Sequence, residues 1–199
     1  MPATVIRYDD HTLVPWKNGQ GITREIAVAR ETDGRFLWRL SIATVDRTGP
    51  FSDFSGYDRI IMLLEGDGMV LDFGGHGRAV MAQPFVPQHF DGGRATHATL
   101  LGGPLTDFNV MTAKGRATAA VEVLSAGQEG IGLHHRETCT FFHVLAGAWD
   151  VTGYSLDGTL DDGDCLCVDG EPWQGRAIAR SPDALLYRIA IAVNPPEGQ

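Results

Sequence analysis

The stretch MLLEGDGMVLD, Met62–Asp72, is repeated in outline by HVLAGAWDVTG, His143–Gly153. Each copy contains an apolar strand, a Leu-x-Gly turn and a second apolar strand. Identical residues fall at matching positions, which are Leu64 with Leu145, Gly66 with Gly147, and Val70 with Val151. Self-similarity of this kind predicts two copies of one β-structured unit within the chain of 199 residues.

Strand-like alternation of apolar residues extends over much of the remaining chain. In RFLWRLSIATV, Arg35–Val45, every second residue from Phe36 to Ile42 is apolar, which is the period of a half-buried strand. Turns rich in glycine and aspartate separate the strands, and no long amphipathic helix is predicted. We expect one short helical turn, at PFSDFSGY, Pro50–Tyr57, in an otherwise all-β sandwich or barrel.

The same alignment, continued along the chain, places QPFVP, Gln83–Pro87, on DCLCV, Asp164–Val168. Each half then reads as strand, turn, strand, turn and strand. This arrangement resembles the cupin fold, an RmlC-like antiparallel jelly roll, and two such halves would form a bicupin. We therefore expect an all-β chain with two closely packed antiparallel barrel or sandwich modules, residues 1–118 and residues 119–199.

Composition and charge narrow the range of partners. The formal net charge is -9 and there is no long run of Lys and Arg, so we expect no nucleic-acid partner. The N-terminus lacks the apolar core of a signal peptide, and no segment has the roughly 20 apolar residues of a membrane span. We expect a cytoplasmic protein that binds no membrane, and a homodimer formed through sheet edges is compatible with the sequence.

The three cysteines do not suggest a disulfide framework, because their number is odd and Cys165 and Cys167 are separated by one residue. These two share a strand face, where small buried cysteines are common. A zinc site built from Cys139, Cys165, Cys167 and a histidine is a weaker alternative. His134 and His135 are consecutive, so on a strand they cannot bind a metal from one face.

The spacing of a cupin metal site can be tested in both halves. Metal-binding cupins commonly use a His-x-His pair, a glutamate four residues later and a glycine seven residues after that. Counted back from the repeat glycines, the corresponding residues are Asp53, Ser55 and Arg59 in the first half, and His134, Arg136 and Thr140 in the second. Neither half keeps the ligand set, so we expect no metal and no other cofactor. Arg59 replaces the glutamate, and a guanidinium can bind a carboxylate through two parallel hydrogen bonds.

Three segments resemble the HutD/Ves family of bacterial bicupins. In the family's order, they are PWKNGQGITREIA, Pro15–Ala27; PFSDFSGYDRIIMLLEG, Pro50–Gly66; and FDGGRATHATLLGGPLTDFNVMT, Phe90–Thr112. The Trp-Lys-Asn-Gly and Asp-Phe-Asn-Val-Met elements are specific, whereas the last third matches mainly in cupin-like pattern. Gln20 departs from the family, which usually has a third consecutive glycine there. The resemblance implies a small-molecule ligand and a link to the regulation of histidine utilisation, without defining a biochemical activity.

Polar residues in these segments are candidates for a ligand-binding site. Thr23 and Glu25 share one face of a strand, and Asp107 and Asn109 share one face of another. Such residues either line a pocket or face solvent, and the polar stretch before them is also explained as a structural turn. The family resemblance favours the pocket. The predicted ligand-binding set is Trp16, Lys17, Asn18, Thr23, Glu25, Arg59, Asp107 and Asn109.

Two classes of function fit these residues. The first is a metal-free cupin-type binding protein for a small anionic metabolite, in which Lys17 and Arg59 pair with carboxylate. The resemblance suggests a urocanate- or formylglutamate-like ligand. The second is a metal-independent isomerase or epimerase acting on a small carboxylic acid, with Glu25 or Asp107 as general base and Lys17 as acid. The sequence offers no base–nucleophile pair, so no catalytic residue is assigned and the binding protein is preferred.

Overall fold

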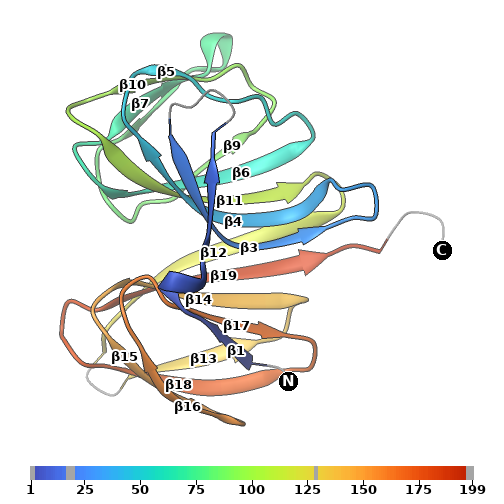
Figure 1. Ribbon diagram of the computed structural model, residues 1–199, viewed down its shortest axis with the longest axis vertical. Helices are drawn as coiled ribbons and strands as arrows, with labels where there is room; N and C mark the ends of the chain where they lie inside the picture. The colour runs from blue at the N-terminus through green and yellow to red at the C-terminus, as the bar shows by residue number, and fades with distance from the viewer. Residues whose placement is uncertain (1–2, 17–20, 128–129, 196–199) are drawn as a thin grey trace. The chain divides into compact units, whose positions relative to one another are not determined.

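The computed structural model describes residues 3–16, 21–127 and 130–195 (Figure 1). These residues form antiparallel strands and two 3₁₀ helices, η1 (Tyr8–Asp10) and η2 (Gly74–His76). Within these ranges, no helix is both long and apolar enough to cross a membrane. The prediction of an all-β, antiparallel fold is confirmed.

The chain divides into two compact units. The N-terminal module comprises Thr12–Ala117, and the C-terminal module comprises Met1–His11 together with Thr118–Gln199. The first strand, β1 (Ala3–Ile6), belongs to the C-terminal module because it pairs along its whole length with β17 (Cys165–Asp169). Strand pairing therefore assigns the chain's first segment to the module formed by its last third.

Two sheets form the N-terminal module. The six-stranded sheet has the order β2-β3-β4-β11-β6-β9, and the four-stranded sheet has the order β5-β10-β7-β8. The strands of the first sheet are β2 (Thr12–Pro15), β3 (Ile22–Arg30), β4 (Phe36–Val45), β11 (Leu105–Ala113), β6 (Tyr57–Glu65) and β9 (Gln88–Asp91). Those of the second are β5 (Gly49–Pro50), β10 (His97–Leu100), β7 (Met69–Asp72) and β8 (Arg78–Met81). Leu63, Met69 and Leu71, from both sheets, belong to one buried apolar cluster, so the sheets face each other as a sandwich.

The C-terminal module is also a two-sheet sandwich. Its sheets have the orders β1-β17-β14-β19-β12 and β13-β18-β15-β16. The further strands of the first sheet are β14 (Cys139–Ala146), β19 (Leu185–Val193) and β12 (Ala117–Ser125). Those of the second are β13 (Ile131–His135), β18 (Trp173–Ala179), β15 (Trp149–Gly153) and β16 (Leu156–Leu160). Leu133, Phe142 and Trp149 lie in its buried apolar cluster, to which both sheets contribute.

The two modules share one topology, as the sequence repeat predicts. The order β4-β11-β6-β9 corresponds to β12-β19-β14-β17, and β5-β10-β7-β8 corresponds to β13-β18-β15-β16. Gly66 follows β6 and Gly147 follows β14, with φ angles of 99° and 74°. Both repeat glycines therefore adopt the left-handed backbone conformation that glycine tolerates best. The N-terminal module adds β2 and β3 at one edge, and the C-terminal module adds β1 at another.

One part of the predicted alignment is wrong. Residues 83–87 form no strand, and the next strand, β9, pairs Asp91 with Asp58. In the C-terminal module, Asp169 of β17 pairs with Cys139. Asp58 and Cys139 are 139 − 58 = 81 positions apart, whereas Asp91 and Asp169 are 169 − 91 = 78 positions apart. The N-terminal module thus holds three more residues before this strand, which an ungapped alignment cannot accommodate.

The helical turn predicted in Pro50–Tyr57 is also wrong. The Asp53 side chain accepts a hydrogen bond from the Ser55 backbone N–H at 2.8 Å, and Gly56 has a φ of 89°. An aspartate that bonds the backbone two residues later favours a turn over a helix. This segment is therefore a loop that leads into β6.

Alanine at the repeat glycines is expected to destabilise the protein. A Cβ at Gly66 would lie 2.8 Å from the carbonyl oxygen of Pro104, and one at Gly147 would lie 2.9 Å from Ser181 Oγ. Together with the positive φ, these contacts should make Gly66→Ala and Gly147→Ala each lower the free energy of unfolding by about 1–3 kcal/mol in chemical denaturation. Gly158→Ala is the control, because its Cβ would meet nothing within 4 Å. Equal stability of all three variants would contradict this account of the turns.

Candidate functional site

Polar and charged side chains gather on the inner face of the six-stranded sheet, the face that carries the module's apolar cluster. Side chains alternate along a strand, so β11 places Leu105, Asp107 and Asn109 on this face. The strands on either side of β11, and β3 beyond them, add residues in register with these positions. The resulting inner-face cluster consists of Thr23, Glu25, Arg39, Ser41, Arg59, Asp107 and Asn109.

Arg59, on β6, is the most deeply buried cation of the cluster. The residue is 7% exposed, and its Nη2 donates a hydrogen bond to Asn109 Oδ1 at 2.5 Å. Its Nε is buried with no hydrogen-bond partner in the described part of the chain. Burial lowers the pKa of Arg59 to about 10, an effect that the charge of Asp107 opposes and that of Arg39 reinforces. The guanidinium therefore stays charged at neutral pH and keeps an unused donor.

Three phenylalanine rings surround this guanidinium. The ring centroids of Phe51, Phe54 and Phe90 lie 5.2, 5.4 and 5.0 Å from Arg59 Cζ, respectively. These distances are within the range of cation–π interactions. The rings also replace water around the charge, so an anion that reached Arg59 would interact with it in a medium of low dielectric constant.

Asn109 connects Arg59 to a buried carboxyl group. Its Nδ2 donates a hydrogen bond to Asp107 Oδ1, and Asp107 is 1% exposed. Burial raises the pKa of Asp107 to about 7, although the charge of Arg59 and the hydrogen bond from Asn109 act in the opposite direction. Asp107 therefore changes protonation near neutral pH, and its neutral form adds no negative charge beside Arg59.

Glu25 is already paired within the cluster. Arg39 Nε donates to Glu25 Oε2 at 2.8 Å, and the two side chains are 16% and 13% exposed. Arg30 approaches the same oxygen at 3.9 Å from a half-exposed position. Arg39 and Ser41 were not among the predicted residues, although the alternation that places Leu40 on one face of β4 places both on the other.

Trp16 and Thr23 are joined at the side of the cluster formed by β3. Trp16 Nε1 donates to Thr23 Oγ1 at 2.8 Å, and the Trp16 side chain packs against the apolar cluster. Lys17 and Asn18, the other predicted residues of this segment, lie outside the described residues. The predicted residues that the structure brings together are Trp16, Thr23, Glu25, Arg59, Asp107 and Asn109.

The residues at the positions of cupin metal ligands lie in different environments, some in an exposed turn and others buried. Asp53 and Ser55 hydrogen-bond each other at 2.7 Å in an exposed turn, whereas Arg59 faces the interior. In the C-terminal module, buried Thr140 forms a hydrogen bond with His135 Nδ1 at 2.9 Å. Within the described ranges, no three His, Cys, Asp or Glu side chains are grouped so that they could hold a metal ion.

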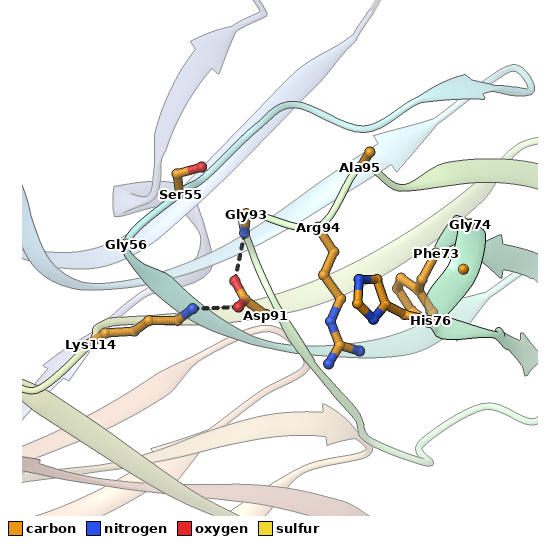
Figure 2. A pocket seen from close by; sticks show the side chains of 11 residues that line it. Ser55, Gly56, Phe73, Gly74, His76, Asp91, Gly93, Arg94, Ala95 and Lys114 are labelled. Atoms are coloured by element: carbon orange, nitrogen blue, oxygen red, sulfur yellow. Dashed lines mark hydrogen bonds and ion pairs between the residues drawn. The ribbon is translucent and has the colours of Figure 1, made fainter.

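A pocket of about 710 Å³ opens on the N-terminal module (Figure 2). Its wall includes Phe73, whose ring centroid lies 5.2 Å from that of Phe90. Lys114 Nζ forms an ion pair with Asp91 Oδ2 at 2.6 Å, and Figure 2 shows Arg94 reaching along the pocket from the neighbouring loop. Because these charges are exposed or paired, the inner-face cluster, with its buried and unused donor, is the stronger candidate site.

The C-terminal module has a pocket of about 590 Å³. Trp173, which is 2% exposed, lines it and donates from Nε1 to the Tyr154 carbonyl oxygen at 3.2 Å. Its charged side chains, Arg136 and Glu171, are exposed to solvent. This pocket is therefore not lined by a buried charge comparable to that of Arg59.

The chain matches the model of the family described as HutD over residues 8–186. It is 42% identical over 120 residues to an uncharacterized 21.2 kDa protein in the hutC 3′ region of Pseudomonas putida. That match covers 59% of this chain and 62% of the relative, which is less than two thirds of the relative's length. The chain is also 36% identical over 151 residues to protein Ves of Citrobacter koseri, and this match covers 75% of each protein.

Solved structures show the same similarity over nearly the whole chain. A conserved protein of unknown function from Pseudomonas aeruginosa is 32% identical with a TM-score of 0.84, covering 97% of this chain and 100% of that one. A structure of HutD from Pseudomonas fluorescens, labelled "formate condition", is 28% identical with a TM-score of 0.82. This match also covers 97% of this chain and 100% of that one. A Cupin 2 conserved barrel domain protein from Leptotrichia buccalis shares the fold at 9% identity, with a TM-score of 0.57 and 96% coverage of both chains. The expected cupin-like fold is confirmed.

The buried carboxyl of Asp107 should make stability depend on pH. The unfolded chain releases this proton near pH 3.8, whereas the folded protein holds it up to about pH 7. Raising the pH between these values therefore favours the unfolded state and lowers the free energy of unfolding. Asp107→Asn should lose this component, so the difference in unfolding free energy between wild type and variant should change from pH 4 to pH 7 in urea denaturation. A difference that stays constant across this range would refute the assignment.

Proposed function

Because the chain belongs to the HutD/Ves family, we propose that its N-terminal module binds a small carboxylate metabolite at Arg59 and that this binding serves the regulation of histidine utilisation. A carboxylate is the anion that a guanidinium pairs with most directly, through two parallel hydrogen bonds. In this proposal the ligand enters the inner-face cluster without the help of a metal ion.

The unused Nε of Arg59 is the observation that carries the proposal. A buried N–H donor without a partner is unfavourable, and a buried charge without a counter-ion is more so. Asn109 supplies only a neutral acceptor at Nη2, and the three rings supply none. A ligand carboxylate could accept from Nε and compensate the charge, which makes the site favourable for an anion of small size.

The surroundings of Arg59 suit a small polar ligand. Ser41, Thr23 and Asn109 offer hydrogen-bonding groups, while Trp16 adds an apolar side. A few convergent polar groups on an apolar background are typical of small-molecule sites. Such a site could hold the carboxylate of a ligand at Arg59 and its neutral polar part nearer to β3 and β4.

The names of the relatives suggest which acids to test. The Pseudomonas putida relative is named for its place in the hutC 3′ region, which favours a metabolite of histidine breakdown, such as a urocanate- or formylglutamate-like acid. The structure of HutD from Pseudomonas fluorescens is labelled "formate condition". Formate is the simplest carboxylate and is therefore worth testing as a ligand. A first panel is therefore formate, acetate, urocanate and formylglutamate.

Substitution of Arg59 tests the proposal directly. Arg59→Gln should weaken binding of the best acid in this panel by about ten- to hundredfold in calorimetric titration, because a charged hydrogen bond is lost. Arg59→Lys should fall between wild type and Arg59→Gln, since it keeps the charge but not the paired donors. Arg78→Gln is the matched control, because Arg78 forms an exposed ion pair with Asp72 in the same module. Equal affinities in wild type and a folded Arg59→Gln would place the ligand elsewhere.

The affinity should also depend on pH through Asp107. Below pH 7 this carboxyl is mostly neutral, whereas above pH 7 it becomes a negative charge next to the bound anion. Acetate affinity should therefore fall by up to about tenfold per pH unit above pH 7. Asp107→Asn should bind acetate with an affinity that is independent of pH over this range. A flat profile in the wild type would show that Asp107 does not titrate beside the ligand.

A metal-independent enzyme is the second candidate, and one observation favours it. A carboxyl group whose pKa is close to 7 can both accept and donate a proton at neutral pH, as a general acid–base requires. Asp107 therefore fits this role better than Glu25, whose carboxylate is bonded to Arg39. Exchange of substrate C–H hydrogen with deuterium from D₂O, followed by NMR for each acid that binds, separates the enzyme from the binding protein. Exchange that disappears in Asp107→Asn would favour the enzyme.

A further inference from the structure

We propose that Glu25 acts as a resident carboxylate that occupies Arg39, and thereby restricts the inner-face cluster to ligands with one negative charge. This inference rests on the proposed function, since it concerns which acids the site at Arg59 accepts. Within the panel it favours formate, acetate and urocanate, which each have one carboxylate, over formylglutamate, which has two. Glu25 would then determine specificity without contacting the carboxylate that Arg59 holds.

The cluster has two cationic ends. Glu25 on β3 and Asn109 on β11 both lie opposite Ser41 on β4, so the three residues form one row across the sheet. Arg39 binds the Glu25 end of this row and Arg59 binds the Asn109 end. Neighbouring strands lie about 4.8 Å apart, so the backbone positions at the two ends are about 10 Å apart. The long side chains of Arg39 and Arg59 reach into this row. A small diacid could therefore span the two cations if both were free to bind a carboxylate.

Charge compensation makes the two ends unequal. Glu25 neutralises Arg39 through a short ion pair in which both side chains are largely buried. Arg30 also approaches Glu25, but it is half-exposed and is screened by water. Arg59 has no such ion-pair partner at hydrogen-bond distance in the described residues, and Asp107 reaches it only through Asn109.

The opposing sheet does not change this balance. Its charged side chains, Arg78 and Asp72, form an ion pair with each other and are 71% and 33% exposed, and its histidine, His97, is exposed as well. When Asp107 is protonated, the cluster therefore presents one uncompensated positive charge, that of Arg59. A monocarboxylate would neutralise it.

A second ligand carboxylate would have to share Arg39 with Glu25. Two carboxylates that share a partly buried site repel each other, and one of them then takes up a proton or leaves. Neutralising Glu25 removes this repulsion and frees the Nε edge of Arg39. The expected consequence is a change of ligand class from monoanion to dianion.

Calorimetric titration at pH 6.5 with butanoate and succinate tests this inference, because both acids have four carbons and differ in one carboxylate. Wild type should bind butanoate at least tenfold more tightly than succinate. Glu25→Gln should gain at least tenfold in succinate affinity while its butanoate affinity changes less than threefold. Glu31→Gln is the matched control, since Glu31 pairs with Arg116 at 2.6 Å in the same module. It should keep the wild-type preference.

A double variant separates charge from shape. In Glu25→Gln/Arg39→Gln the ion pair is replaced by two neutral amides, so the gain in succinate affinity should disappear while butanoate still binds. Circular dichroism and thermal unfolding establish whether each variant is folded. If a variant does not fold, the comparison of the two acids in the wild type still tests the inference.

The outcomes distinguish this inference from the proposed function. Equal affinities of wild type for succinate and butanoate, or an unchanged ratio in a folded Glu25→Gln, would overturn the role of Glu25 while leaving binding that depends on Arg59 intact. Absence of binding by every acid tested, or binding that persists unchanged in Arg59→Gln, would overturn both.

Discussion

Side chains alternate between the two faces of each strand, and in the N-terminal module this period fixes both the core and the charged cluster. The inner face of β11 carries Leu105, Asp107 and Asn109, while the inner face of β6 carries Arg59 and Leu63. Apolar residues toward one end of these strands pack against the opposing sheet, and polar residues toward the other bond among themselves. A shift of one residue in the strand register would move the charged residues to the other face of the sheet, and it would move the apolar core residues with them. The burial of the apolar residues therefore also holds Arg59 in place.

Much of this arrangement follows from local pattern. The repeat glycines and the strands around them could be derived from spacing alone, because strand period and turn chemistry act over a few residues. The inward position of Arg59 followed from the cupin resemblance, since Arg59 stands where metal-binding cupins carry their glutamate ligand. The same alternation pointed to Asp107 and Asn109. Alternation along β4 identifies Arg39 in the same way, because Arg39 and Ser41 lie on the face opposite Leu40.

Other features depend on contacts between distant segments. The phenylalanine rings around Arg59 come from the loop before β6 and from β9, and nothing in their local sequence indicates a shared partner. The three additional residues before β9 became visible only through the pairing of Asp91 with Asp58. Likewise, the placement of β1 in the C-terminal module depends on pairing with β17, more than 150 residues later. Pairing over such distances is chosen by the whole sheet and is weakly encoded in any one segment.

The comparison between the modules shows what one substitution can do to a shared framework. Arg59 of β6 and Thr140 of β14 are equivalent in the repeat, and both are buried. Thr140 is neutral and is accommodated by a hydrogen bond with His135. A guanidinium at the same place cannot be accommodated so simply, because burying a charge is far less favourable than burying a hydroxyl group. The aromatic rings and the Asn109 amide surround that charge, while burial raises the pKa of nearby Asp107 despite it. The N-terminal module therefore differs from the C-terminal module in charge at this position. At the position where metal-binding cupins carry a negative ligand for a cation, it carries a cation that is suited to an anionic ligand.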